Sequence, residues 1–322
     1  MFIPFPLHYL SYFCNRYINQ KENRMSRYSF TLAFALLLLA CHPGREKKDN
    51  VLTVTIEPQR YFLERIVGDK FQVNTLVPPG SSPETFEPSP SAMIKLGESR
   101  AYFKVGFLGY ENAWANRLAE NNPDMKIVDC STGIELIYGG HDHHDHDHAH
   151  GDAEHDHDHA EAVDPHVWSS ARNALIFSQN MLNAVVEIDG ENAGYYRDNF
   201  EKLSQKIIET DSVLTGLLKE IPSRSFIVYH PALAYFARDY DLEQYSIEFE
   251  GKNPSPAQMR ELVDLARAEN IKTVFVQQEF DIKNSEVIAR EIGAQSHTIN
   301  PLAYAWDEEL IRIARLLAKQ ER

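Results

Sequence analysis

The alternation of apolar and polar positions predicts short strands and helices that follow one another along most of the chain. In a first block, apolar stretches at 51–56, 71–77, 101–105 and 126–129 alternate with helical spacing at 58–68, at 90–98 and around Trp114 and Leu118. In a second block, strands are predicted at 225–229, 243–247, 272–277 and 295–299, and helices at 231–240, 255–268, 284–292 and 307–320. Strands alternating with helices indicate βαβ units and mainly parallel sheets.

A long helical region, 169–220, separates the two blocks, with a possible break at Asp189-Gly190. Its second part has apolar residues close to helical spacing, and Pro222 ends it. We therefore predict an α/β fold with an N-terminal lobe at 51–168 and a C-terminal lobe at 222–322, joined by a long rigid helical spine at 169–221. A chain of 322 residues has room for about two domains, each large enough for its own core.

The N-terminus has the pattern of a targeting signal. Residues 28–41 read YSFTLAFALLLLAC and follow Arg24 and Arg27, but the apolar run is shorter than the ~20 residues that span a bilayer. Its end resembles a bacterial lipobox, in which Cys41 becomes the lipidated N-terminus. We expect a leader at 1–40, with translation starting at Met25 rather than Met1, and a lipidated tether at 41–50.

The charge of the chain is concentrated in one segment. Asp and Glu number 47 against 32 Lys and Arg, and this net charge of −15 argues against nucleic acid and anionic membrane surfaces as partners. Residues 141–161 hold eight of the acids, no Lys or Arg, and nine of the 14 His. These are His141, His143, His144, His146, His148, His150, His155, His157 and His159. Without an apolar period the segment is predicted to be a loop, and imidazole with carboxylate is a metal-binding composition. The alternative is a plain acidic insertion without a role.

Polar residues at strand exits are candidate metal ligands. In open α/β sheets, ligands bind beyond the carboxyl ends of the strands. Glu84 follows the second strand, His166 follows the His-rich loop, and His230 and Asn300 follow the first and last strands of the second block. These four exits could converge on one cleft between the lobes, walled by Trp168, Tyr229, Tyr235 and Phe236. Neutral imidazole with carboxylate suits Zn²⁺, Mn²⁺ or Fe²⁺. Alternatively, Glu84 opens a helix or turn without touching metal.

Three stretches together match a known family: Pro83-Glu84-Thr85-Phe86-Glu87-Pro88-Ser89-Pro90, Asp164-Pro165-His166-Val167-Trp168 and Tyr229-His230-Pro231-Ala232. From about residue 50 to 322, the chain resembles the periplasmic metal-binding component of bacterial zinc and manganese ABC importers. The resemblance implies a non-enzymatic protein on the exported face of the cell envelope, anchored through Cys41. It would deliver metal to a membrane permease that has a cytoplasmic ATPase. A His-rich loop before the Asp-Pro-His stretch is typical of zinc-type members, so Zn²⁺ is the expected cargo, with Mn²⁺ possible and a monomer as the default.

Two positions depart from the family pattern. The family usually has His at the position of Glu84 and Asp at the position of Asn300. Glu84 still supplies an oxygen ligand, whereas Asn300 is a weaker, neutral one. With Glu84, His166 and His230 the zinc site carries net +1, and the fourth position falls to water or another carboxylate. Glu248, Glu250 and Glu279 are the candidates, each expected to be solvated rather than ligating.

Other functions give different expectations. A zinc hydrolase would need an activating base, and the chain has no His-Glu-x-x-His stretch to supply it. A zinc-buffering or adhesive surface lipoprotein would need only the loop, and a manganese or iron importer component would use the same cleft. Ligand His must be neutral, so affinity is expected to fall below about pH 6.5.

Overall fold

The computed structural model describes residues 50–138, 163–248, 252–280 and 283–319, all within one unit that begins at Asn50. The expected leader, the expected lipidation site at Cys41 and the His-rich loop lie outside the described residues. Among the residues described, no helix combines the length and apolar composition that a membrane crossing requires.

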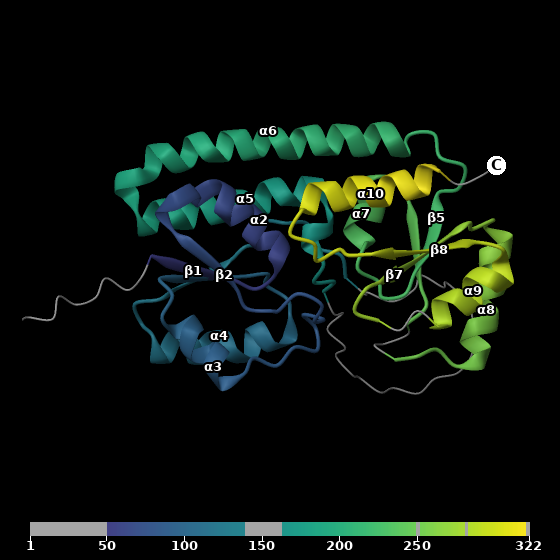
Figure 1. The fold of residues 1–322 in the computed structure, drawn as a ribbon, viewed down its shortest axis with the longest axis horizontal. Helices are drawn as coiled ribbons and strands as arrows, with labels where there is room; N and C mark the ends of the chain where they lie inside the picture. Colours follow the sequence, from purple (N-terminus) through teal and green to yellow (C-terminus); the bar gives the residue numbers. More distant parts are fainter. Residues whose placement is uncertain (1–49, 139–162, 249–251, 281–282, 320–322) are drawn as a thin grey trace, which may run out of the picture. The chain divides into compact units, whose positions relative to one another are not determined.

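The first lobe is a parallel sheet with helices on both faces (Figure 1). Its strands are ordered β2-β1-β3-β4, with Leu52 opposite Val73 on one side and opposite Ala101 on the other. The elements are β1 (Val51–Val54), α2 (Glu57–Val67), the 3₁₀ turn η1 (Gly68–Lys70), β2 (Gln72–Thr75), α3 (Pro90–Gly97), β3 (Ala101–Lys104), α4 (Gly109–Asn121) and β4 (Lys126–Asp129).

The second lobe repeats this arrangement. Its strands pair in parallel in the order β6-β5-β7-β8, which is the order of the first lobe shifted by four strands. The elements are β5 (Ser225–Val228), α7 (Ala234–Asp239), β6 (Glu243–Ser246), α8 (Pro256–Ala268), β7 (Thr273–Gln277), α9 (Lys283–Ile292), β8 (Gln295–Ile299) and α10 (Trp306–Ala318). The predicted two-lobe α/β fold is therefore confirmed.

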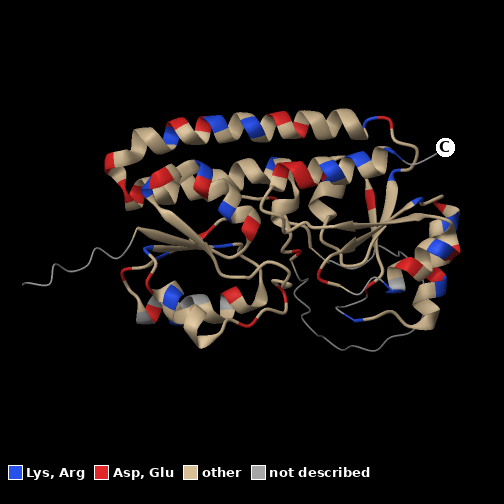
Figure 2. Cartoon of the chain, viewed as in Figure 1, with Lys and Arg blue, Asp and Glu red and all other residues tan. Residues whose placement is uncertain are grey.

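Two helices connect the lobes. They are α5 (Ala171–Ile188) and α6 (Ala193–Leu218), separated at Asp189 by the short turn η3 (Gly190–Asn192) where the break was predicted. The α6 helix packs on α2 of the first lobe and on α10 of the second (Figure 1). It buries an apolar face that includes Leu203 and Leu214, while charged residues of both signs follow one another along its outer side (Figure 2).

The main hydrophobic core is continuous between the lobes. One cluster contains Leu52 and Phe103 of the first sheet, Phe226 and Phe275 of the second, and Trp306 of α10. The length of the chain leaves room for a core in each lobe, but the main cluster belongs to both lobes. The reason is geometric: α2, α5, α6 and α10 form a shared layer that covers one face of both sheets. Only the opposite faces keep separate clusters, one in each lobe.

Candidate metal centre

The structure brings together three of the four predicted ligands. Glu84 lies in a turn after β2, His166 precedes the 3₁₀ turn η2 (Val167–Ser169), and His230 follows the end of β5 by two residues. One ligand atom from each lies within 4.8 Å of the other two. The two His Nε2 atoms are 3.2 Å apart, and the Glu84 carboxylate oxygens lie 3.4 Å from Nε2 of His166 and 3.2 Å from Nε2 of His230. The turn at Glu84 does not begin a helix, since α3 starts at Pro90.

Both imidazoles are oriented by a carboxylate at their other nitrogen. Nδ1 of His166 lies 2.8 Å from Oδ1 of Asp164, and Nδ1 of His230 lies 2.7 Å from Oε2 of Glu248. A carboxylate at this distance accepts the Nδ1 proton, which leaves the Nε2 lone pair available for a metal ion. Two lone pairs and a carboxylate that face one another repel unless a proton or a metal cation lies between them.

The spacing of the three donors suits a tetrahedral ion. Zinc–ligand bonds of about 2.0–2.1 Å in a tetrahedron place neighbouring ligand atoms roughly 3.3–3.4 Å apart. The Nε2–Nε2 separation of 3.2 Å is close to this value, and each Nε2 lies 3.2–3.4 Å from a Glu84 oxygen, Oε1 for His166 and Oε2 for His230. The donors are therefore nearly preorganised for zinc, and the fourth vertex is left to another group.

Electrostatics favour a cation in this site. His166 is 4% and His230 is 9% exposed, and Asp164 and Glu248 are also buried. Burial by itself lowers the pKa of His230, but hydrogen bonds to Glu248 and Glu84 outweigh it and raise the pKa to about 9. For His230, proton competition is therefore expected to begin above pH 6.5, because these carboxylates stabilise the imidazolium.

The cavity at the three donors is small and flanked by aromatic side chains. Its volume is about 20 Å³, which is room for roughly one water molecule or one bare ion. Trp168 lies beside His166, with ring centroids 5.1 Å apart, and Phe280 stacks on His230 at 5.3 Å. The polar and apolar residues that line the cavity are Ser82, Pro83, Glu84, His166, Trp168, His230, Ala232, Gln277, Glu279, Phe280, Pro301 and Leu302.

Of the predicted wall residues, Trp168 lines this cavity and the other three do not. Tyr235 and Phe236 are fully buried in the core, and the Tyr235 hydroxyl donates a hydrogen bond to the backbone oxygen of Asp164. Tyr229 lies next to Phe280, outside the lining. These aromatic residues support the site from behind rather than face the ion.

Asn300, the fourth predicted ligand, lies outside this cavity. It lines a neighbouring one with Ile56 and Ser81, and its Oδ1 accepts a hydrogen bond from the Leu302 amide at 3.1 Å. The last strand turns there, so the amide side chain closes its own turn. The structure therefore does not bring Asn300 together with the other three residues.

The three additional carboxylate candidates have different positions. Glu248 is 8% exposed and bound to His230, so the expectation that it is solvated is wrong. Glu279 is partly buried and lines the cavity. Burial raises the pKa of its carboxyl, although Gln278 and His230 oppose the shift. Glu250 lies outside the described residues.

Sequence reasoning missed the roles of Asp164, Glu248 and Phe280. Asp164 had a signal, because it lies two residues before His166 within a stretch already singled out. Glu248 follows β6, which pairs with β5, so its contact with His230 depends on the neighbouring strand. Phe280 follows β7 by three residues and had no signal beyond its place near a strand exit.

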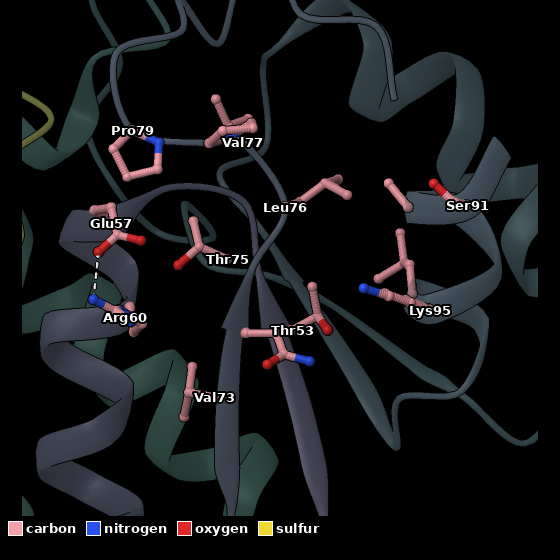
Figure 3. Close-up of a pocket in the computed structure, with 14 residues that line it drawn as sticks. Thr53, Glu57, Arg60, Val73, Thr75, Leu76, Val77, Pro79, Ser91 and Lys95 are labelled. Carbon is pink, nitrogen blue, oxygen red and sulfur yellow. Dashed lines mark ion pairs between the residues drawn. The ribbon is translucent and has the colours of Figure 1, made fainter. Parts of the chain in front are cut away.

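A larger cavity lies elsewhere in the first lobe. It has a volume of about 560 Å³ and lies beside the edge strand β2, between α2 and α3 (Figure 3). Figure 3 shows Glu57 paired with Arg60 on one side, at 2.7 Å, and Lys95 on the other. Among the described residues that line it there is no His or Cys, and two of them are cationic. This cavity is therefore a poor site for a metal ion.

The fold and the donor set define a solute-binding protein of two α/β lobes with a candidate metal site. The family model of the zinc-uptake complex component A, periplasmic, matches residues 52–313. The chain belongs to this family. The members of this family are periplasmic solute-binding components of uptake systems, and the family is not one of enzymes. Family membership does not favour the alternative of a manganese importer component.

Three relatives illustrate the similarity. The chain is 29% identical over 292 residues to the high-affinity zinc uptake system protein ZnuA of Bacillus subtilis, covering 87% of this chain and 89% of that protein. A crystal structure of ZnuA has 34% identity, covers 84% of this chain and 98% of its own, and superposes with a TM-score of 0.75. A ZnuA deletion mutant with zinc bound also has 34% identity, covers 84% and 97%, and has a TM-score of 0.74.

Proposed function

We propose that this protein captures one Zn²⁺ outside the cytoplasm at Glu84, His166 and His230 and delivers it to an ABC-type permease driven by a cytoplasmic ATPase. The observation that supports it best is the convergence of three donors, with each imidazole oriented by its own carboxylate. The small cavity at these donors suits an ion better than an organic solute.

Zinc is favoured over manganese by the donor types. At a site of nitrogen and oxygen donors, affinity for divalent ions rises from Mn²⁺ to Zn²⁺ in the Irving–Williams order. Two of the three donors here are imidazoles, which suit zinc, whereas manganese prefers oxygen ligands. Glu84 in place of a third imidazole weakens this preference without reversing it. Zinc-binding relatives named ZnuA agree with this choice.

The His-rich loop and the lipid anchor belong to the same proposal. The loop at 141–161 would collect Zn²⁺ weakly through its nine His and eight acidic residues and raise the concentration of zinc near the cavity. Cys41 would carry the lipid that holds the protein at a membrane on the exported side. The tether at 41–50 would set how far the folded part can reach from that membrane toward the permease. A ZnuA deletion mutant was crystallised with zinc bound, so the segment deleted from that relative is not required for zinc binding there.

Zinc titration of the mature protein, purified without a His tag, tests the site. In competition with a chromophoric chelator we expect one tight ion together with several weak ones from the loop. His166→Ala and His230→Ala should each lose the tight ion and keep the weak ones. His297→Ala is the matched control, because this histidine lies within β8 and outside the cavity. A tight ion that persists in the His166→Ala, His230→Ala double variant would contradict the proposal.

Transport and buffering are separated in the bacterium. A component of an importer is needed for uptake of radioactive zinc at low external concentration, and its loss should be rescued by excess zinc. A zinc-buffering or adhesive lipoprotein would leave the initial uptake rate unchanged when its gene is deleted. Complementation with the His166→Ala variant, whose loop is intact, shows whether the cavity or the loop is required.

A further inference from the structure

We infer that Glu279 supplies the fourth ligand of the captured ion. The family usually has an acidic residue at the exit of the last strand, where this chain has Asn300, and here the acid would come from the exit of β7 instead. The inference rests on the proposed function, because it concerns the same cavity. It assigns a metal-binding role to a residue that the sequence had placed in solvent.

Glu279 is positioned for this role by the turn that follows β7. It lies two residues beyond Gln277, the last residue of that strand, and lines the same cavity as Glu84, His166 and His230. Its Oε1 atom is buried and accepts no hydrogen bond from the described part of the chain. A buried carboxylate oxygen without a donor is costly, and a cation in the cavity removes that cost.

Elimination among the other polar side chains of the cavity leads to the same residue. Gln277 is engaged at both ends, because its Oε1 accepts from the His230 amide and its Nε2 donates to the His230 carbonyl. Ser82 Oγ accepts a hydrogen bond from the Glu84 amide at 3.3 Å. The Trp168 indole is a donor only and is bonded to the backbone oxygen of Pro301. Glu279 is the remaining oxygen donor among the described residues that line the cavity.

The two competing fourth ligands fit less well. Asn300 faces the neighbouring cavity, and its amide oxygen already accepts the Leu302 amide hydrogen. A bound water would supply only a neutral oxygen and would leave the buried Oε1 of Glu279 without a donor or a cation. The net charge of the site does not distinguish between the candidate fourth ligands, because Asp164 and Glu248 already place two carboxylates behind the imidazoles.

Glu279 must move to bind. The group of ligand atoms that lie within 4.8 Å of one another contains Glu84, His166 and His230 but not Glu279. Glu279 lies in a turn rather than in a strand, so its side chain can rotate toward the ion without disturbing the sheet. The structure thus corresponds to three preorganised donors and a fourth that closes on the ion.

The test compares Glu279→Gln with Asn300→Ala. Glutamine keeps the shape of the side chain and removes the charged oxygen donor, and Asn300→Ala removes the competing ligand. We measure the zinc dissociation constant by chelator competition and the visible absorption of the Co²⁺-loaded protein, which reports the ligands and their geometry. We expect Glu279→Gln to weaken zinc at least about tenfold and to change the Co²⁺ spectrum, with Asn300→Ala close to the wild type. Glu286→Gln, an exposed glutamate in the first turn of α9, is the charge-matched control.

Each other outcome has a definite meaning. A Glu279→Gln variant with wild-type zinc affinity and Co²⁺ spectrum overturns the inference. So does weakening in Asn300→Ala alone. A purely structural role would lower the melting temperature of the metal-free variant and leave the Co²⁺ spectrum unchanged, which also overturns it. If the wild type itself binds no tight zinc ion, the proposed function fails, and this result is distinct from the failure of Glu279 as a ligand.

Discussion

His166 and His230 differ in role from the other described histidine because of what lies behind them. Each donates Nδ1–H to a buried carboxylate, whereas burial and the charge of Arg312 lower the pKa of His297 in β8. The carboxylate that orients His230 also favours its protonated form. A metal ion and a proton therefore compete for the same nitrogen, and this competition makes zinc binding depend on pH.

We predict that zinc binding releases a proton from His230 at neutral pH. The pKa of His230 is about 9 in the metal-free protein, and zinc binds only the neutral imidazole. As pH falls below about 9, the apparent dissociation constant should rise roughly tenfold per pH unit. Calorimetry at pH 7.5 in buffers of different ionisation enthalpy should give close to one proton released per zinc from this residue.

Glu248→Gln is the informative variant for this prediction. It keeps an acceptor for Nδ1–H but removes the charge that raises the pKa of His230, so fewer protons should be released at pH 7.5. Zinc affinity should also fall about 10–100-fold, as is usual when the partner of a ligand histidine is lost. A dissociation constant that stays constant from pH 9 to pH 7 would show that the imidazole is already neutral.

The residues that could be predicted from the sequence are those whose position follows from strand order. Glu84 follows β2 and His230 follows β5, and ligands of open α/β sheets bind beyond such strand ends, whereas His166 precedes η2 and is indicated by the Asp164-Pro165-His166 stretch. Asn300 occupies such an exit as well, yet its side-chain oxygen accepts a hydrogen bond within the local turn. The backbone geometry after the end of the strand determines this contact. The role of Glu248 could not be predicted, since it depends on the pairing of β6 with β5.

Among the elements, α5 links the site to the core of the second lobe. It begins at Ala171, and its N-cap Ser170, four residues after His166, accepts a hydrogen bond from the Asn173 amide through its hydroxyl. The same hydroxyl donates a hydrogen bond to Asp239 at the end of α7. One buried side chain therefore starts the first spine helix and connects it to the second lobe.

We predict that Ser170→Ala lowers the free energy of unfolding by about 1–2 kcal/mol, because it removes an N-cap and a buried hydrogen bond. Chemical denaturation of the metal-free protein measures the change. Ser212→Ala, at an exposed position within α6, should change stability by less than about 0.5 kcal/mol. Equal effects of the two substitutions would mean that Ser170 neither caps α5 nor connects it to α7 to any measurable extent.

The elements themselves were largely predictable because the periods of their apolar residues are distinct. The predicted strands and helices are all found in the described residues, and the differences lie at their ends. The helix predicted from 231 begins at Ala234, because Pro231 and Ala232 turn the chain after His230. Such turns are fixed by local hydrogen bonds, which the hydrophobic period does not report.

At the scale of the whole molecule, the shared core implies one cooperative unit between Asn50 and the last described residues. The sequence indicated two lobes correctly but did not show that they share a core. Periodicity shows which face of a helix is apolar, but not that α6 spans both lobes and packs on α2 and α10. These contacts of α6 depend on its length and on how the two lobes are arranged in space.

We predict that the metal-free mature protein unfolds in a single calorimetric transition, with matching van't Hoff and calorimetric enthalpies. Zinc at 1,000 times its dissociation constant should stabilise it by about 4 kcal/mol. Two resolved transitions, of which zinc shifts only one, would instead mean that the lobes fold independently. The His166→Ala variant is the control, since its unfolding transition should not shift as a result of zinc binding at the cavity.

The last prediction concerns the His-rich loop as a separate part of the molecule. Its flanking residues are held together, because Tyr138 and Val163 form an antiparallel bridge and the Asp164 amide donates to the Ile137 carbonyl at 2.9 Å. Deleting 141–161 leaves Gly139, Gly140 and Ala162 between them, a length and composition suited to a tight turn. The deletion should therefore leave the fold, the melting temperature and one tight zinc ion unchanged and remove several weak ions. A loop of full length with its nine His replaced by Ser separates the loss of imidazoles from the loss of length, and should also keep only the tight ion. Loss of that ion in either variant would show that the loop contributes to the cavity site.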